Sequence, residues 1–137
     1  MTDVIRKVSY FAMDVPDKPG EAAKVLTALS RAGVNLLAFS GFPAGRRSQL
    51  DFIPEDVPLF RKALSAERLK VRPKKTGFLV QGNDRPGAVA ELLQKLAAAG
   101  INVTAVDGVS AGAGRWGAIL WVKPQSVNKA AKVLQAV

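Results

Sequence analysis

A stretch of 29 residues occurs twice in the chain, 67 positions apart, and this internal repeat constrains the fold more than any other feature. Residues 17–45 and 84–112 align without a gap and share 13 identities in 29 positions. Average residue usage would give about two identities by chance. We therefore predict two copies of one structural unit.

Each copy starts with a turn, Asp17-Lys18-Pro19-Gly20 or Asp84-Arg85-Pro86-Gly87, that follows an apolar run and precedes apolar residues at helical spacing. The pattern predicts helices over 19–32 and 86–99, with proline at the first helical position. The aspartate is expected to accept a hydrogen bond from the first helical turn. Gly33 and Gly100 are expected to end the helices in the left-handed conformation.

The remaining patterns predict strands and helices in the order β-α-β-β-α-β, the ferredoxin-like split unit of an α+β protein. The first unit has predicted strands at 5–14, 34–39, 48–53 and 67–73, and a second helix at 57–65. The second unit has predicted strands at 78–81, 101–109 and 118–122, and a second helix at 124–137, where the chain stops without a last strand. This gives seven strands in two tandem units, 1–75 and 76–137, packed as one body.

Composition excludes several kinds of chemistry. The chain has no cysteine and no histidine, which removes disulfides, thiol nucleophiles, the usual zinc sites and imidazole acid–base catalysis. No metal or cofactor site is indicated. The absence of cysteine also fits a cytoplasmic protein. There is no apolar run of membrane-spanning length and no signal peptide, so we expect that the protein does not enter a membrane.

The net charge of +9 raises the possibility of a nucleic-acid partner. The densest basic stretch is 68–75, where a strand would place Arg68, Lys70, Arg72 and Lys74 on one face and Leu69 and Val71 on the other. Two interpretations remain open. The basic face protects the edge of a half-buried strand, which we favour, or it forms an anion-binding stripe.

Two further features are given structural interpretations. Gly112, Gly114 and Gly117 have the spacing of a dinucleotide-binding loop, but a predicted strand follows them instead of the required helix, so we predict a hairpin. Trp116 and Trp121 are predicted to be core or interface residues.

The apolar run 118–122 suggests a strand buried on both faces. This run and the exposed strand edges together predict a homodimer.

A βαββαβ unit with Asp-X-Pro-Gly before its first helix and Gly-[Val/Ile]-Asn after it resembles an ACT domain. The resemblance covers nearly the whole chain as two tandem copies. It implies regulatory modules that bind amino acids, pair side by side and hold the ligand at the turn before the first helix. Carried over by position, it points to Asp17, Gly20 and Asn35 in the first unit, and to Asp84, Gly87 and Asn102 in the second.

The side chains around the second turn favour that copy as the tighter site. Gln81, Asn83 and Arg85 add donors and acceptors for a zwitterion to Asp84 and Asn102, whereas Pro16 replaces Asn83 in the first unit. A helix N-terminus favours a carboxylate, and glycine lets it approach. The structural alternative is that Asp, Pro, Gly and Asn only build the turns.

We therefore predict a non-catalytic amino-acid sensor. The alternative is a basic nucleic-acid-binding module on a ferredoxin-like fold, although such modules carry exposed aromatic residues on central strands. Catalysis would depend on aspartates, namely Asp14, Asp17, Asp51, Asp84 or Asp107, and no two of them have a spacing that ensures a shared face.

Overall fold

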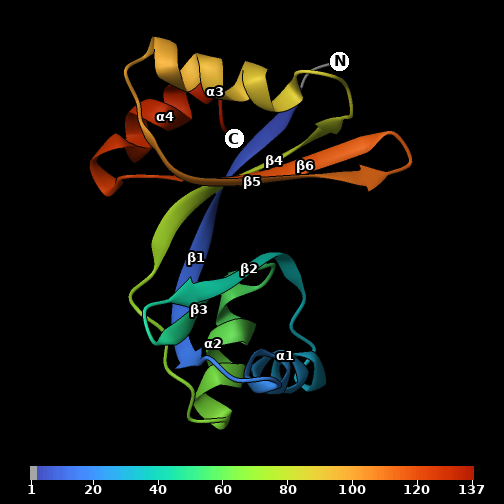
Figure 1. Cartoon of the computed structure of the whole chain (residues 1–137), viewed down its shortest axis with the longest axis vertical. Coiled ribbons are helices and arrows are strands. Elements are labelled where there is room, and N and C mark those ends of the chain that lie inside the picture. Colours follow the sequence, from blue (N-terminus) through green and yellow to red (C-terminus); the bar gives the residue numbers. More distant parts are fainter. Residues whose placement is uncertain (1–2) are drawn as a thin grey trace. The chain divides into compact units, whose positions relative to one another are not determined.

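The computed structural model describes residues 3–137, which form six strands, four α-helices and one short 3-10 turn (Figure 1). The elements in chain order are β1 (Val4–Pro16), α1 (Glu21–Arg31), β2 (Leu36–Ala44), β3 (Arg47–Pro54), α2 (Val57–Ala66), β4 (Lys75–Asn83), α3 (Ala88–Ala98), β5 (Val103–Gly112), β6 (Arg115–Val122), η1 (Pro124–Ser126) and α4 (Val127–Leu134). Two compact units divide the chain: Ser9–Lys75, and Thr76–Val137 with the described residues up to Val8. The predicted α+β architecture is confirmed.

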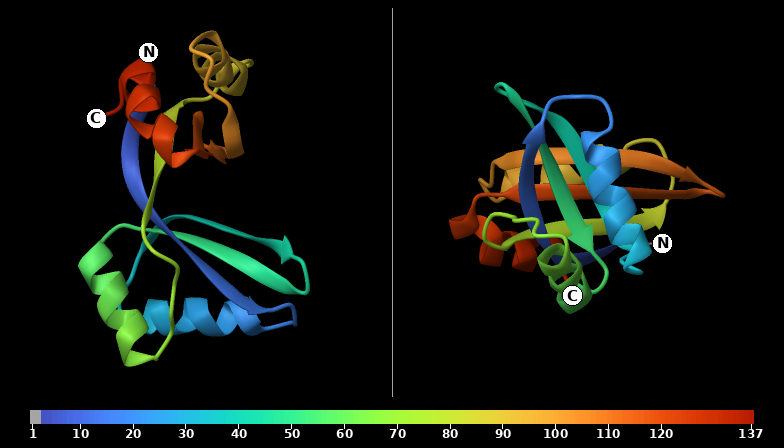
Figure 2. Two further views of the ribbon diagram at one scale, coloured as in Figure 1. Left: turned by 90° about the vertical axis from the view of Figure 1, so that its left-hand side faces the viewer. Right: turned by 90° about the horizontal axis from the view of Figure 1, so that it is seen from below.

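In the unit Ser9–Lys75 the strands follow the order β2-β3-β1, and every pair is antiparallel. Helices α1 and α2 lie on one face of these strands (Figure 2). Phe11 of β1 lies opposite Phe52 of β3, and both rings pack on Phe60 of α2 with centroid distances of 5.1 and 5.6 Å. All three side chains are fully buried and form the centre of the core.

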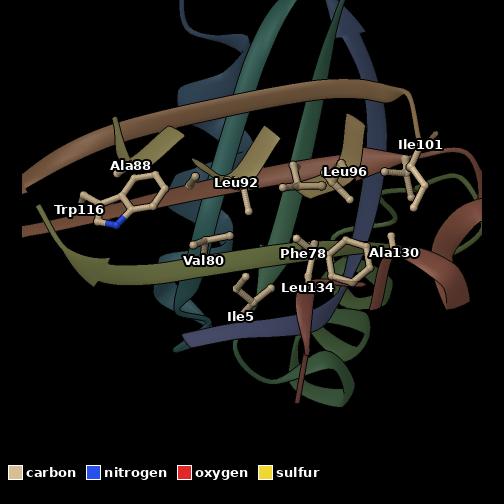
Figure 3. Close-up of a cluster of buried hydrophobic side chains, with 13 residues drawn as sticks. Ile5, Phe78, Val80, Ala88, Leu92, Leu96, Ile101, Trp116, Ala130 and Leu134 are labelled. Carbon is tan, nitrogen blue, oxygen red and sulfur yellow. The ribbon is translucent and has the colours of Figure 1, made fainter. Parts of the chain in front are cut away.

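In the second unit β4, β6 and β5 are neighbours in that order, again antiparallel, and α3 and α4 cover one face of them (Figure 1). Figure 3 shows the core between helices and strands. Phe78, Leu96 and Leu120 are fully buried within it. Ala88, Leu92 and Leu96 recur at helical spacing and face this core, which explains why the segment forms a helix that packs on the sheet.

Within residues 3–137 no strand follows α4, and the first residues of β1 occupy the place of a fourth strand in the second unit. The strand order puts β1 next to β4, and Ile5 belongs to the core of this unit (Figure 3). On its other side Ile5 accepts a hydrogen bond from the N–H of Val137 at 2.9 Å, and Lys7 donates to the carbonyl of Val137 at 3.4 Å. The repeat gave no indication that residues preceding the first unit complete the second.

The predicted strand at 67–73 is wrong, which reduces the seven predicted strands to six. Residues 69–74 have no regular secondary structure, and a single backbone hydrogen bond joins the segment to β1, from the N–H of Arg72 to the carbonyl of Ala12 at 2.9 Å. The predicted alternation is nevertheless present. Leu69 and Val71 pack against the core. The basic side chains that alternate with them, Arg68, Lys70, Arg72 and Lys74, are exposed.

The two helices that follow the repeated turns begin later than the sequence predicted. The helices begin at Glu21 and Ala88, after the prolines, and the N-cap residues are Gly20 and Gly87 in the left-handed conformation, with φ of 88° and 82°. No side chain caps either helix. The prediction of proline at the first helical position is therefore wrong by two residues, and the predicted aspartate cap is wrong as well.

The helix ends follow the prediction. Gly33 and Gly100 have φ of 79° and 72°. The N–H of Val34 donates to the carbonyl of Leu29, and the N–H of Ile101 donates to that of Leu96. With the second bond made by each glycine, this is a Schellman motif that satisfies the last carbonyls of each helix.

The strands extend further into the predicted loops than the sequence suggested. Gly45-Arg46 and Ala113-Gly114 are two-residue turns that join β2 to β3 and β5 to β6. The glycine pattern 112–117 is therefore a hairpin, as predicted. The apolar residues 118–122 are all buried, as are both tryptophans, so this strand no longer supports the prediction of a homodimer.

Candidate ligand-binding site

The turn before α3 lies beside a small open pocket in the second unit. The pocket has a volume of about 280 Å³. It is formed by the turn, the first residues of α3, the end of β5 and one side chain of β6, and its lining residues are Asp84, Arg85, Gly87, Ala88, Val89, Ala90, Gly108, Val109, Ser110 and Trp116. Three of the predicted site residues, Asp84, Arg85 and Gly87, thus line one pocket.

The backbone at Gly87 leaves the helix N-terminus open. A Cβ at Gly87 would have no heavy atom within 4 Å, and no side chain caps α3. The first N–H groups of an α-helix lack partners within the helix and carry the positive end of its dipole. The turn therefore presents donors to an anionic group, such as a carboxylate, in the pocket.

Asp84 is held in place by three hydrogen bonds. Its Oδ2 accepts from the hydroxyl of Ser110 at 2.9 Å, and its Oδ1 accepts from the N–H of Arg85 at 3.0 Å. Its own N–H donates to the carbonyl of Gly114 at 2.8 Å. The carboxylate remains exposed to solvent and keeps lone pairs for a further donor. An ammonium group in the pocket has a fixed acceptor here.

Arg85 is engaged with the protein. Nη1 donates to Oδ1 of Asp3 at 3.0 Å and to the carbonyl of Asn83 at 2.9 Å. Nη2 donates to Oδ2 of Asp3 at 3.1 Å and to Oε2 of Glu91 at 3.0 Å. The guanidinium lowers the pKa of the Asp3 carboxyl, an effect that burial partly opposes, and the two carboxylates raise the pKa of Arg85. Four of its five N–H groups are used, so Arg85 positions the turn.

The other predicted residues of the second site lie outside the pocket lining. Gln81 and Asn83 belong to β4, where alternation places them on the face opposite the core residues Phe78 and Val80. Asn83 accepts from Nη1 of Arg115 at 2.8 Å. Asn102 follows the C-terminal end of α3, so the length of that helix separates it from the turn.

The first unit has the same turn with different partners. Asp17 accepts from the hydroxyl of Ser48 on β3 at 2.9 Å, and Gly20 is as open as Gly87. Asn35 follows the end of α1 and donates to Glu55 at 3.4 Å. The three predicted residues therefore lie at two ends of a helix.

A second pocket, of about 480 Å³, lies along β1 and α1 of the first unit. None of Asp17, Gly20 and Asn35 lines it. Its lining carries charges of both signs. The acidic residues are Asp14, Glu21 and Glu67, and the basic residues are Lys24, Arg68 and Lys70. Glu21 pairs with Lys24 at 2.9 Å, and Asp14 pairs with Arg72 at 2.6 Å. This pocket offers no single charge preference.

The aspartates considered for catalysis are involved in structural contacts. Nη2 of Arg72 donates to Asp14 and lowers the pKa of that carboxyl, and Nη1 donates to Gln49 at 3.3 Å. Gln49 in turn donates to the buried Asp51 at 3.0 Å. Among residues 3–137 no cluster of three or more His, Cys, Asp or Glu side chains could hold a metal ion.

The nucleic-acid alternative gains no support from the side chains. The two exposed aromatic residues in the described chain, Phe39 and Phe42, lie on β2, which is the last strand at one side of its unit. A stacking platform needs aromatic residues on central strands.

No helix within residues 3–137 is long and apolar enough to cross a membrane.

The fold is a βαββα unit used twice, and in the second unit the open helix N-terminus lies beside a pocket that suits a small anionic ligand. The chain belongs to the ACT domain family, whose model matches residues 9–68 and 78–137. This confirms the resemblance that the repeated turns suggested.

Solved structures show the same fold. Protein BT0572 from Bacteroides thetaiotaomicron is similar over 97% of this chain and 88% of its own, with a TM-score of 0.77 and 20% identity. The regulatory subunit of aspartate kinase from Thermus thermophilus, in a ligand-free form, is similar over 98% and 95%, with a TM-score of 0.66 and 19% identity. No sequence among the curated proteins matches the chain.

Proposed function

We propose that this chain is a non-catalytic sensor of a free amino acid, and that the pocket beside Gly87 is its main site. The observation that carries the proposal is the position of Asp84 and the N-terminus of α3 in one pocket. An amino acid has an ammonium group for the carboxylate and a carboxylate for the helix N–H groups. Tandem ACT domains are typical of small-molecule-binding regulatory proteins, and the regulatory subunit of aspartate kinase has a similar fold.

The remaining lining favours a small apolar side chain on the ligand. Val89 and Val109 are 37% and 64% exposed, and both line the pocket. The volume of about 280 Å³ lies just below the range of about 300–1,000 Å³ that is usual for ligand pockets. A compact amino acid with an aliphatic side chain fits this combination of size and chemistry better than a nucleotide does.

The proposal is tested by thermal-shift measurements with each proteinogenic L-amino acid at millimolar concentration. A ligand present at about 100 times its dissociation constant raises the free energy of unfolding by roughly 2.7 kcal/mol. We expect one or a few aliphatic amino acids to raise the melting temperature of the wild-type chain. A panel without any shift contradicts the proposal.

We also propose that the chain forms a homodimer through β5. This strand pairs only with β6 among residues 3–137, and of its ten residues only Asp107 is charged. Natural edge strands usually carry charges or proline that prevent pairing. Because Gly108, Val109 and Ser110 line the pocket, a partner on this edge would lie next to it.

Light scattering tests the assembly. Ala105 is exposed on β5, and Ala105→Lys places a charge on the edge. We expect a dimeric wild type and a monomeric variant, whereas Ala97→Lys on the exposed side of α3 leaves the dimer intact. A monomeric wild type at micromolar concentration contradicts this proposal.

The cytoplasmic location, predicted from the absence of cysteine, stays a prediction.

A further inference from the structure

The carboxylate of Asp3 accepts three side-chain hydrogen bonds in the second unit. It accepts from Nη1 and Nη2 of Arg85 at 3.0 and 3.1 Å, and from Nε1 of Trp116 at 3.0 Å. Its side chain is 13% exposed. Bidentate pairing of a guanidinium with a carboxylate fixes the orientation of both groups. Asp3 therefore fixes two side chains that come from different elements.

Both partners of Asp3 line the pocket. Arg85 belongs to the turn before α3, and Trp116 belongs to β6. Arg85 also donates to the carbonyl of Asn83 and to Glu91 of α3, so the same guanidinium connects the end of β4, the turn and the helix. We call Asp3, Gly82, Arg85, Glu91 and Trp116 the Asp3 cluster.

Gly82 leaves the space that the Asp3 carboxylate occupies. A Cβ at Gly82 would collide with Oδ1 of Asp3 and would lie 3.1 Å from Nε1 of Trp116. The residue is buried in β4 and its backbone needs no positive φ. A glycine is required here because of this contact and not because of the conformation of the backbone.

The first unit lacks every counterpart of the cluster. At the 67-residue offset, Val15 stands for Gly82, Lys18 for Arg85 and Lys24 for Glu91. Ser48 stands for Trp116, because it pairs with Val15 as Trp116 pairs with Gly82. A lysine does not make the bidentate contact that arginine makes. The glycines of the two turns share the left-handed conformation, but only the second turn is tied to a strand through a partly buried carboxylate.

From this geometry we infer that Asp3 is a positioning residue for the pocket of the second unit, and that the docking of residues 3–8 is coupled to the order of the turn 84–87. The inference that this coupling affects binding rests on the proposed function of the pocket. By thermodynamic linkage, a ligand that orders the turn also strengthens the docking of residues 3–8, and the loss of that docking weakens binding by the same factor.

Two variants disrupt the cluster from different sides. Asp3→Asn removes the charge that holds Arg85, and Gly82→Ala displaces the carboxylate while it leaves every charge in the chain unchanged. Asp14→Asn is the matched control, because Asp14 also pairs with an arginine, Arg72, but lies in the first unit.

The first measurement is amide hydrogen exchange of the intact chain without any ligand. We expect both cluster variants to exchange about tenfold faster at the hydrogen-bonded amides of the turn and of the helix start, which are those of residues 84, 85, 88 and 91, with residues 92–96 in the middle of α3 almost unchanged. The control variant should match the wild type at all of these residues. An unchanged turn, or equal acceleration throughout the second unit, overturns the inference, because a purely structural role would act uniformly.

The second measurement is binding of each proteinogenic L-amino acid to the wild type and the three variants. We expect any amino acid that binds the wild type to bind Asp3→Asn and Gly82→Ala about tenfold more weakly, and Asp14→Asn equally well. Equal binding by all four proteins refutes the positioning role and leaves the proposed function intact. If no amino acid binds the wild type, the proposed function fails, and hydrogen exchange still decides whether Asp3 orders the turn.

Discussion

Ser110 donates its hydroxyl hydrogen to Asp84 at 2.9 Å, and this hydrogen bond joins the end of β5 to the turn before α3. In the first unit the equivalent aspartate, Asp17, accepts from Ser48 of β3 instead. The repeated aspartate is therefore anchored by a different strand in each unit. Only in the second unit do the aspartate and its serine partner both line the pocket.

This difference predicts unequal effects of two serine substitutions. Ser110→Ala leaves Asp84 with one bond fewer, and a net hydrogen bond is worth about 1 kcal/mol, so we expect amino-acid binding about fivefold weaker by calorimetry. Ser48→Ala removes the corresponding bond in the first unit and should leave binding at the main site unchanged. If Ser48→Ala has the larger effect, the main site is in the first unit.

The two N-cap glycines allow a comparison that holds backbone strain constant. Gly20→Ala and Gly87→Ala each place a Cβ in the left-handed region, which costs roughly 1–2 kcal/mol, and neither Cβ meets another atom within 4 Å. We expect similar losses of stability in chemical denaturation. We expect weaker amino-acid binding only for Gly87→Ala, because its methyl group stands where the ligand carboxylate approaches the amides. Equal binding by both variants would place the ligand elsewhere.

The core of each unit is tested by a pair of leucines at equivalent repeat positions. Leu29 and Leu96 are 2% and 0% exposed. Truncation of a buried leucine to alanine removes contacts and leaves a cavity, at a cost of about 2–5 kcal/mol. Leu29→Ala and Leu96→Ala should both reduce the free energy of unfolding by an amount in this range. A loss below about 1 kcal/mol for either variant would show that its side chain is not in a packed core.

The pH dependence of stability follows from two carboxylates. Arg85 and Arg72 lower the pKa values of Asp3 and Asp14, so the folded chain favours their charged forms. Their contribution is present above the unfolded value of about 3.9 and is lost as the pH falls through the lowered values. Since the chain has no histidine, we expect constant stability from about pH 6 to pH 9. A transition near pH 6.5 in denaturation midpoints would contradict this account.

The repeat predicted the elements well because helix ends and turns depend on nearby residues. The helices begin within three residues of the predicted starts at 19, 86, 57 and 124, and Gly33 and Gly100 terminate two of them as expected. The segment 67–73 shows the limit of such patterns. Alternation reports which side chains are buried, and Leu69 and Val71 are partly buried without the hydrogen-bond ladder of a strand.

The site was harder to predict because its parts are brought together by long-range pairing. Asp84 and Gly87 were identified from the turn itself, whereas Ser110 and Trp116 reach the pocket through the register of β5 and β6. No local signal connects Asp3 to Arg85, which lies 82 residues away. Asn35 and Asn102 were grouped with the turns because they recur with them, but a helix separates each asparagine from its turn.

The most direct test of the account is a backbone amide NMR titration of the wild-type chain with each proteinogenic L-amino acid. The account predicts saturable shift changes for an aliphatic amino acid, concentrated at residues 84–90 and 108–110, with residues 17–23 little affected. Shift changes centred on residues 17–23, or no saturable change with any amino acid, would contradict it.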